Sequence, residues 1–332
     1  MINSAVIGLG GISKVHISSI TSLSNVKLVA VCDNDIEKKA SAPEGAVFYT
    51  DYEELLRKEK IDIVHICLPH FLHYPVAKKA AEAGVNIFAE KPLAMNAKEG
   101  GEYCKLENAH NVKICLCFQN RLNDTSQTLY NLLRKGEYGK ITGVRGSVAW
   151  YRPKEYYEAG PWRSLMAEAG GGCMINQAIH TMDLMQYFAG SPIVSVKGSI
   201  GQVLDYGIEV EDTATGRINF ENGALGLFTA SVANYTDENV ELSVRCEKAD
   251  FVLRAKKLFI VKEGIEELLV EDSSMFAGKQ VYGPSHIRLI EQFYKAVETG
   301  GTDYIHPEEG MPSLMMIDAI RESSATGKAV YF

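Results

Sequence analysis

The feature that most constrains the fold is an apolar run, residues 2–8, that leads directly into the glycine-rich turn Gly8-Leu9-Gly10-Gly11-Ile12-Ser13. This pattern predicts a buried strand, a tight turn and a helix over roughly 11–23. Gly8 permits the turn, Gly10 removes a side chain where a phosphate must approach, and the start of the helix favours an anion. We therefore expect a dinucleotide site that includes Gly8, Gly10, Gly11 and Ile12.

The choice between dinucleotides depends on Asp33, which follows a second apolar strand at 27–32. An acidic residue roughly 20 residues after the turn accepts hydrogen bonds from the adenosine ribose and repels a 2′-phosphate. Asn34 and Asp35 follow, with no arginine, so NAD is favoured over NADP. Two alternatives remain open: a glycine-rich turn without a ligand, and Asp33 as a residue that merely ends the strand. Ser13 replaces the usual third glycine.

Strand-like and helix-like patterns alternate over the first 120 residues. Strands are expected at 61–68, 85–89 and 112–118, and helices at 51–60 and 74–84, the latter closed by Gly84. Such alternation is typical of a parallel, doubly wound sheet, the Rossmann arrangement. We therefore predict an α/β fold whose residues 1–120 form a dinucleotide-binding Rossmann domain.

The pattern changes beyond residue 120, which predicts a second domain over 121–332 of the α+β kind. Helices are expected at about 124–135, 174–189, 285–299 and 309–326. Asn222-Gly223, between two alternating runs, is a strong hairpin signal. The predicted sheet is large, open and mostly antiparallel, with helices on one face. Its strands are expected at 141–150, 193–204, 213–221, 224–233, 239–246, 250–254 and 257–262.

The segment Glu90-Lys91-Pro92 follows the strand expected at 85–89. Doubly wound folds bind ligands outside the carboxyl ends of their strands, so Lys91 is placed to contact both the nicotinamide end of a cofactor and a reacting hydroxyl. A lysine titrates near ~10.4 and is mainly cationic at neutral pH. We therefore expect Lys91 to polarise a substrate oxygen rather than to act as a base; the alternative is a surface lysine in a turn.

His180 follows three consecutive glycines, 170–172, and lies four residues after Asn176. On one helix these two positions share a face. Histidine has the right unperturbed pKa, ~6.5, to take a proton from a hydroxyl as hydride leaves the same carbon. The alternative is a structural histidine, and Asp183 is either its partner or a solvated helix residue. We expect the glycines to allow close approach of backbone and substrate.

Composition excludes several classes of function. The 332 residues carry a formal net charge of -8, which argues against a nucleic-acid partner. No window approaches the ~18–20 apolar residues of a membrane span, and we see no signal peptide, so we expect a cytoplasmic protein without a membrane partner. The seven cysteines lack a C-x-x-C pattern and lie mostly in apolar runs, which indicates buried free thiols. A metal site at Cys115-x-Cys117 is the alternative; with no second ligand pair visible, we expect no metal.

The chain resembles the glucose–fructose oxidoreductase / inositol dehydrogenase / rhizopine-catabolism family, written Gfo/Idh/MocA, over nearly its whole length. This resemblance implies an NAD(P)-dependent oxidoreductase of sugars, cyclic polyols or nucleotide-linked sugars, with Lys91 and His180 as catalytic residues. The family often has an aspartate where this chain has Asn176, which can orient an imidazole but lacks the full charge to stabilise imidazolium. The resemblance rests on Gly8-x-Gly10-x-x-Ser13, Asp33, Leu68-Pro69-His70-x-x-His73, Glu90-Lys91-Pro92, Trp162-Arg163 and Gly170-Gly171-Gly172 through Asn176 and His180 to Asp183.

The same resemblance also implies an oligomeric state and further cofactor and substrate contacts. It implies a homodimer or homotetramer formed through the second-domain sheet. Two other functions stay open: an NAD-dependent glycosidase that works by transient oxidation, and a non-catalytic nucleotide-binding sensor. For the tyrosines and Trp162 of the 151–163 region, loop packing is the alternative to substrate contact. The implied cofactor residues are Leu68, Pro69, His70, His73, Glu90 and Lys91, and the implied substrate residues are Tyr151, Arg152, Trp162, Arg163, Asn176 and His180.

Overall fold

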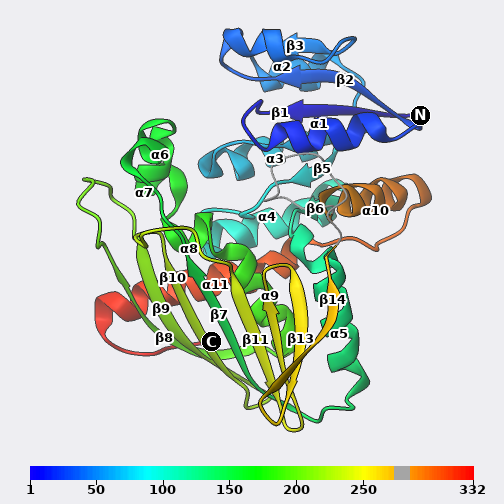
Figure 1. The fold of residues 1–332 in the computed structure, drawn as a ribbon. Helices are drawn as coiled ribbons and strands as arrows, with labels where there is room; N and C mark the ends of the chain where they lie inside the picture. Colours follow the sequence, from blue (N-terminus) through cyan, green and yellow to red (C-terminus); the bar gives the residue numbers. More distant parts are fainter. Residues whose placement is uncertain (273–284) are drawn as a thin grey trace. The chain divides into compact units, whose positions relative to one another are not determined.

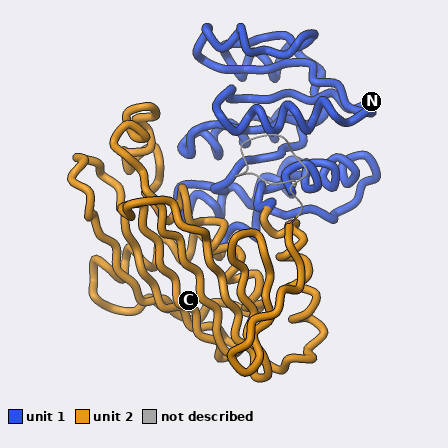
Figure 2. Tube along the Cα trace, in the orientation of Figure 1, with its two compact units in different colours: residues 1–119, 284–311 blue, residues 120–283, 312–332 orange. Residues whose placement is uncertain are grey.

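The computed structural model describes residues 1–272 and 285–332, which form two compact units (Figure 2). Unit 1 comprises residues 1–119 and 284–311, and unit 2 comprises residues 120–283 and 312–332. The predicted second domain, 121–332, differs from unit 2 because residues 284–311 belong to unit 1. The physical reason lies in α10 (Ser285–Thr299), whose Tyr294 hydroxyl bonds to the Ser4 hydroxyl at 2.7 Å and to His65 Nε2 at 2.9 Å.

Unit 1 contains a six-stranded parallel sheet with strand order β3-β2-β1-β4-β5-β6, which confirms the predicted Rossmann fold. The short strand β3 (Val47–Tyr49) and the helix over Ala97–His110, which contains Gly100-Gly101, gave no clear sequence signal. The strands are β1 (Ile2–Ile7), β2 (Val26–Cys32), β3 (Val47–Tyr49), β4 (Ile63–Ile66), β5 (Asn86–Ala89) and β6 (Ile114–Leu116). The other helices are α1 (Ser13–Ser22), α2 (Tyr52–Lys58), α3 (His73–Glu82) and α4 (Ala97–His110).

The strand order places the switch point of this sheet at β1, which pairs with β2 on one side and β4 on the other. Ile7, the last residue of β1, is in register with both Cys32 and Ile66. The carboxyl ends of these parallel strands therefore lie at one edge of the sheet. Ligands of doubly wound folds bind at such an edge, and the loops that follow β1, β2, β4 and β5 carry the predicted cofactor residues.

Unit 2 contains a nine-stranded sheet with order β14-β13-β12-β11-β7-β10-β9-β8-β15. Its pairs are antiparallel except β7 with β10, which confirms the predicted mostly antiparallel sheet. The hairpin at Asn222-Gly223 is also confirmed, because it joins β9 to β10 and Gly223 has φ +85°. The strands are β7 (Ile141–Ala149), β8 (Ile193–Gly201), β9 (Thr213–Phe220), β10 (Leu225–Ser231), β11 (Glu241–Cys246), β12 (Asp250–Arg254), β13 (Lys257–Lys262), β14 (Ile265–Glu271) and β15 (Val330–Tyr331).

Helices of unit 2 pack on one face of this sheet (Figure 1). A Cβ at Gly146 would lie 2.6 Å from Met185 Sδ of α9 (Ile179–Ala189), and a Cβ at Gly216 would lie 2.8 Å from Ile320 of α11 (Met311–Thr326). Gly146 and Gly216 are both in register with Phe228, so the two helices cover the same face. α5 (Asp124–Lys135) packs against β13 and β14. No helix among the described residues combines the length and apolarity needed to cross a membrane.

Candidate active site

The glycine-rich turn has the geometry that the dinucleotide prediction requires. Gly8 has φ +93°, and a Cβ there would collide with the Cys67 carbonyl oxygen, so only glycine fits. At Gly10 and Gly11, by contrast, no atom of a described residue other than the chain neighbours lies within 4 Å of the position a Cβ would take. Among the described residues, no side chain caps the N-terminus of α1 at Ile12. The turn therefore offers open space and uncapped backbone N–H groups, which fit a pyrophosphate.

Asp33 and Ser13 hold this turn in place. The Leu9 N–H donates to Asp33 Oδ2 at 2.8 Å, and the Asp35 N–H donates to Asp33 Oδ1 at 3.0 Å. The buried Ser13 hydroxyl donates to the Gly10 carbonyl at 2.7 Å. Serine at the third glycine position thus adds a bond within the turn. Each Asp33 oxygen keeps a second lone pair with which it can accept from a ribose hydroxyl.

Glu90 lies in a buried hydrogen-bond network at the end of β5. His16 Nε2 lies 2.9 Å from Glu90 Oε1, and the Lys91 N–H donates to Glu90 Oε2 at 3.2 Å. His286 Nε2 lies 3.6 Å from Glu90 Oε1. Burial alone would raise the pKa of Glu90, but the bonds from His16 and His286 outweigh it and hold that pKa well below its usual range. Glu90 is therefore an ionised carboxylate that fixes the backbone of Lys91.

The network extends from Glu90 through four further residues, and its proton positions follow from the geometry. Burial lowers the pKa of His16 and of His65, so both rings are neutral. The Glu90 carboxylate can only accept, so His16 Nε2–H donates to it. The neutral His16 ring then carries no proton on Nδ1, and this nitrogen accepts from His65 Nδ1–H at 2.8 Å. His65 Nε2 then accepts from Tyr294, whose oxygen accepts from Ser4. Every group in this chain of donors has its partner, as buried polar groups require.

The cofactor residues predicted after β4 lie in the same unit. The 3-10 turn His70–Leu72 and α3 follow Pro69, and His73 is fully buried. His73 Nδ1 lies 2.7 Å from the Pro92 carbonyl and Nε2 lies 2.8 Å from the Leu68 carbonyl. Burial lowers the pKa of His73, so the neutral ring donates to one of the two carbonyls at a time. His73 thus ties the segment after β4 to the Lys91–Pro92 turn, whose peptide bond is cis.

Among the described residues, two clusters have donor sets that could hold a metal ion. One potential ligand atom from each of His16, Glu90, Cys117 and His286 lies within 4.8 Å of the others. The hydrogen bonds above already engage His16 and Glu90, and burial raises the pKa of the Cys117 thiol, which keeps it protonated and a poor ligand. The absence of a metal stays a prediction. All seven cysteines are free. The second cluster comprises Glu107, His306 and Glu308.

In unit 2 the helix predicted over 174–189 is wrong in one respect: it is two helices. α8 (Cys173–Asn176) and α9 are separated by Gln177-Ala178. The Ala178 N–H donates to the Cys173 carbonyl, five residues back. This bond interrupts the regular four-residue spacing of α-helical hydrogen bonds. Asn176 and His180 therefore do not share a helix face through i,i+4 spacing. Both side chains are half-buried.

The glycine run before α8 serves packing within unit 2. A Cβ at Gly172 would collide with the backbone oxygen of Glu211, and a Cβ at Gly171, where φ is +140°, would collide with the Arg321 guanidinium. The Cys173 N–H also donates to the Glu211 carbonyl at 2.9 Å. The close approach we expected these glycines to allow for substrate is, in the structure, an approach to Glu211 and Arg321. This packing fixes where α8 begins.

Two predicted substrate residues of the 151–163 region, Arg152 and Arg163, contact the ring of Tyr156 in α6 (Lys154–Glu158). The Tyr156 hydroxyl accepts hydrogen bonds from Asn176 Nδ2 at 3.1 Å and from Gln177 Nε2 at 3.0 Å. The Cζ atoms of Arg163 and Arg152 lie 4.9 and 5.6 Å from the centroid of its ring. Tyr156 is one of the tyrosines for which the sequence left substrate contact and loop packing open, and Gln177 is not among the predicted site residues. Tyr157 is buried and Tyr151 is exposed.

Asp183 has a structural partner. It is 1% exposed, so the alternative of a solvated helix residue is wrong. Its carboxylate accepts two hydrogen bonds from the Arg121 guanidinium, at 2.9 and 2.6 Å. Arg121 in turn lies 4.7 Å from the Tyr187 ring centroid. This bidentate pair anchors α9, and with it His180, to the segment that precedes α5.

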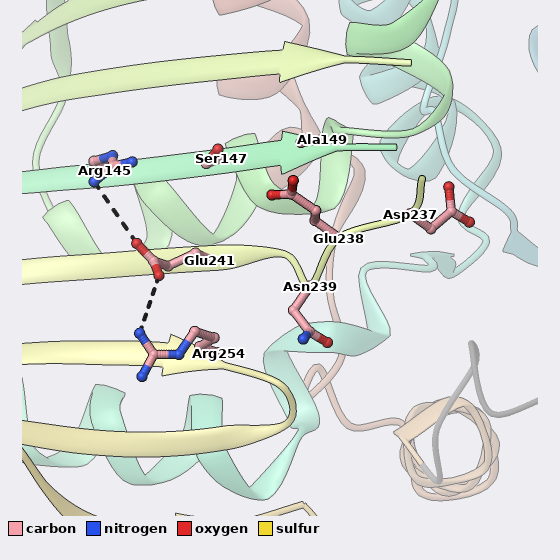
Figure 3. Close-up of a pocket in the computed structure, with 8 residues that line it drawn as sticks. All are labelled: Arg145, Ser147, Ala149, Asp237, Glu238, Asn239, Glu241 and Arg254. Carbon is pink, nitrogen blue, oxygen red and sulfur yellow. Dashed lines mark hydrogen bonds and ion pairs between the residues drawn. The ribbon is translucent and has the colours of Figure 1, made fainter. Parts of the chain in front are cut away.

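A hollow of about 370 Å³ lies along β7, β11 and β12 (Figure 3). Glu241 pairs there with Arg145 at 3.8 Å and with Arg254 at 3.5 Å. Its rim includes Asp237, which pairs with Arg152 at 3.0 Å and thereby connects the rim to the Tyr156 group. Charged side chains of both signs line this hollow, which contains none of the predicted catalytic side chains. The remaining lining residues are Ser147, Ala149, Glu238 and Asn239.

Comparison with known proteins agrees with these features. The family model described as "Oxidoreductase family, NAD-binding Rossmann fold" matches residues 2–118, and the one described as "GFO/IDH/MocA C-terminal domain" matches residues 126–252. D-glucoside 3-dehydrogenase of Escherichia coli is 27% identical over 98% of this chain and 96% of its own length. D-xylose 1-dehydrogenase (NADP(+)) 2 of Haloferax volcanii is 26% identical over 98% of each chain. The WlbA dehydrogenase of Chromobacterium violaceum, solved with NADH and UDP-GlcNAcA, has a TM-score of 0.87 and 27% identity, over 100% of this chain and 96% of that one.

Proposed function

This chain belongs to the Gfo/Idh/MocA family of oxidoreductases, and from that premise we propose how its own residues carry out the reaction. The protein is an NAD(P)-dependent oxidoreductase that acts on a hydroxyl-bearing carbon of a sugar, cyclic polyol or sugar derivative. The observation that carries this function is the glycine turn after β1, with open space over Gly10 and Gly11 and Asp33 bonded to Leu9. That geometry suits the pyrophosphate and ribose of a dinucleotide.

We propose distinct roles for Lys91 and His180. Oxidation of a CH–OH group removes a hydride from carbon and a proton from oxygen, and bound NAD(P) supplies the hydride acceptor. His180 takes the proton as a general base, since an imidazole titrates near neutral pH. Lys91 donates a hydrogen bond to the reacting oxygen and stabilises its developing negative charge. The Glu90 carboxylate supports that role because it accepts the Lys91 N–H at 3.2 Å.

Asn176 acts in this proposal through orientation rather than charge. Its amide donates to the Tyr156 hydroxyl at 3.1 Å, so it holds the Tyr156 ring in place. An amide carries no net charge and gives an imidazolium less stabilisation than a carboxylate would. We therefore propose a positioning role for Asn176 and no stabilisation of the imidazolium by charge.

For the cofactor we propose NAD rather than NADP. A 2′-phosphate at the ribose would meet the Asp33 carboxylate after β2, and Asp35 follows two residues later. The Haloferax relative, whose name specifies NADP(+), indicates that this choice varies between relatives. The choice therefore depends on local residues such as Asp33 rather than on the fold.

We also propose a homodimer or homotetramer that forms through the sheet of unit 2. Leu225 and Leu227 on β10 are 45% and 47% exposed, on the face opposite to Gly226 and Phe228. Exposed apolar side chains on a sheet face favour association with a second copy. Leu227→Glu should shift the mass measured by light scattering toward the monomer, whereas an unchanged mass would exclude this face. The seven free cysteines support a reducing cytoplasm as the compartment.

The proposed function is tested by cofactor titration combined with one variant. Calorimetric titration of NAD and of NADP into the purified protein should show tight binding of NAD. Lys91→Ala should then lower turnover of an accepted sugar far more than it weakens NAD binding, because Lys91 contacts the reacting oxygen. Near-normal turnover of Lys91→Ala would remove this residue from the reaction, and failure to bind either nucleotide would contradict the dehydrogenase assignment.

A further inference from the structure

We propose that Arg163 selects substrates that carry an anionic group, a carboxylate or a phosphate, an inference that rests on the proposed function. The half-buried Arg163 lies between two aromatic side chains, with its Cζ 4.9 Å from the ring centroids of both Tyr156 and Trp162. Aromatic rings contact the faces of a guanidinium, whereas its five N–H donors lie in its plane. The stacking therefore orients those donors without using them.

No described residue neutralises the charge of Arg163. Among the described residues it forms no ion pair, and the segment 273–284 contains no Asp or Glu. This contrasts with Arg152, which contacts the same Tyr156 ring but is paired with Asp237 at 3.0 Å. The chain has 42 acidic against 34 basic residues, so acidic partners are abundant. A carboxylate or phosphate on a substrate would supply the missing opposite charge with bidentate geometry.

The position of this guanidinium is built into the chain. The Arg163 N–H donates to the Gly160 carbonyl at 3.0 Å, in a short turn between α6 and the 3-10 helix Pro161–Ser164. A Cβ at Gly160 would collide with Arg163 Nη1, so any larger residue would displace the guanidinium. Glycine at position 160 therefore keeps Arg163 against the Tyr156 ring.

Tyr156 links Arg163 to the proposed reaction centre. Its oxygen accepts from both Asn176 and Gln177, which uses its lone pairs and leaves its own O–H to donate. The Tyr156 ring thus has Arg163 stacked on it and has Asn176 at its hydroxyl end. Asn176 and Arg163 are separated by about the length of one aromatic side chain, that of Tyr156. A sugar whose reacting carbon lies at Asn176 would therefore bring its other substituents within reach of Arg163. We infer that Arg163 recognises the anionic substituent rather than the reacting hydroxyl.

The test compares matched neutral and anionic sugars. The panel consists of glucose, galactose and mannose, each as the free sugar, the uronate and the 6-phosphate, together with UDP-glucose as a nucleotide-linked sugar. The proteins are the wild type, Arg163→Gln, Arg163→Lys and Lys154→Gln. Lys154 is a matched control because it is an exposed cation at the start of α6, the helix that carries Tyr156, and it is paired with Glu158. One readout is kcat/KM from NADH formation; the other is fluorescence of Trp162, one of only two tryptophans.

We expect the wild type to prefer at least one anionic class over its neutral counterpart. Arg163→Gln should lower kcat/KM for that class by about ten- to hundredfold, the worth of a charge-assisted hydrogen-bond pair. Arg163→Lys should retain part of the preference, and Lys154→Gln all of it. Preference for uronates, for hexose phosphates or for UDP-glucose identifies the source of the anionic group. Melting temperatures near that of the wild type would show that the variants fold.

Two outcomes would overturn the inference. One is equal kcat/KM for neutral and anionic sugars, or an Arg163→Gln loss that is the same for both, which would assign Arg163 to hydroxyl binding or packing. The other is tryptophan fluorescence that responds to no anionic sugar. The fluorescence titration needs no turnover, so it decides anion binding even if the dehydrogenase assay is silent. Silence in the assay with clear binding would count against the proposed function and not against Arg163.

Discussion

His16 Nε2 lies 2.9 Å from Glu90 Oε1, and both side chains are buried at the carboxyl edge of the parallel sheet. This contact connects α1, which begins at the nucleotide turn, with the end of β5, which carries Lys91. Glu90 also accepts a hydrogen bond from the backbone N–H of Lys91. The network therefore positions the proposed catalytic lysine through its backbone. His16 is therefore a positioning residue.

Removal of His16 should damage both stability and turnover. His16→Leu leaves the buried Glu90 carboxylate without its nearest donor, which should cost about 1–3 kcal/mol of unfolding free energy. His16→Gln keeps an N–H donor toward Glu90 and should recover part of the loss. Urea denaturation measures the stability, and kcat measured separately from KM should fall more in His16→Leu than KM rises. A stability equal to that of the wild type in His16→Leu would contradict the network.

The same network predicts that acid destabilises the protein from about pH 6.5 downward. The folded state lowers the pKa of His16 and His65, whereas the unfolded chain titrates near ~6.5, so the unfolded state binds more protons below that pH. Each histidine contributes a slope of at most about 1.4 kcal/mol per pH unit. The depressed pKa of Glu90 adds a further loss below about pH 4.3, where the unfolded carboxyl becomes protonated.

Denaturation between pH 8 and pH 5 checks this dependence. His65→Gln removes one titrating group and keeps a donor toward His16, so its unfolding free energy should vary less with pH than that of the wild type. His110→Gln, on α4 and outside the network, should leave the slope unchanged. If His65→Gln and the wild type lose stability in parallel, the buried histidines are not the origin of acid sensitivity.

Cofactor choice should depend on Asp33. Asp33→Ser removes the negative charge that faces a 2′-phosphate and keeps a hydroxyl that can accept the Leu9 N–H, at present bonded to the carboxylate at 2.8 Å. The ratio of kcat/KM for NAD to that for NADP should fall by about tenfold or more, the effect of one charge-assisted bond. Asp35→Asn is the control, because Asp35 caps the 3-10 helix Ile36–Ser41 through the Glu37 N–H. An unchanged ratio in Asp33→Ser would place the selection elsewhere.

Local periodicity was enough to predict the parallel sheet of unit 1 and the mostly antiparallel sheet of unit 2. The spacing of apolar residues within each strand or helix indicates which of its faces is buried. The packing of α10 on unit 1 could not be predicted in this way. Ser4 and Tyr294 are 290 residues apart, and nothing in either segment specifies the other. The break at Ala178, which splits the helix expected over 174–189, follows a glycine run packed against Glu211 and has no local signal.

The candidate site shows a similar division. Gly8, Gly10 and Asp33 follow from the backbone requirements of a phosphate turn, so their spacing alone predicted them. His16, His65 and Gln177 were missed because a single histidine on a helix, a histidine in a strand or a glutamine between two helices has many possible partners. Only the three-dimensional contacts reveal that Glu90 selects His16 and that Asn176 selects Tyr156.

The central claim, hydride transfer between a nicotinamide and a sugar hydroxyl, is tested most directly by NADH absorbance in the wild type and in His180→Ala. The wild type with excess NAD and the sugar panel should accumulate NADH in proportion to the sugar consumed. His180→Ala should bind NAD normally and turn over at least ~100-fold more slowly, the scale of a general-base contribution. Sugar release from a glycoside without NADH, or NAD binding with no turnover by the wild type on any panel member, would contradict the account.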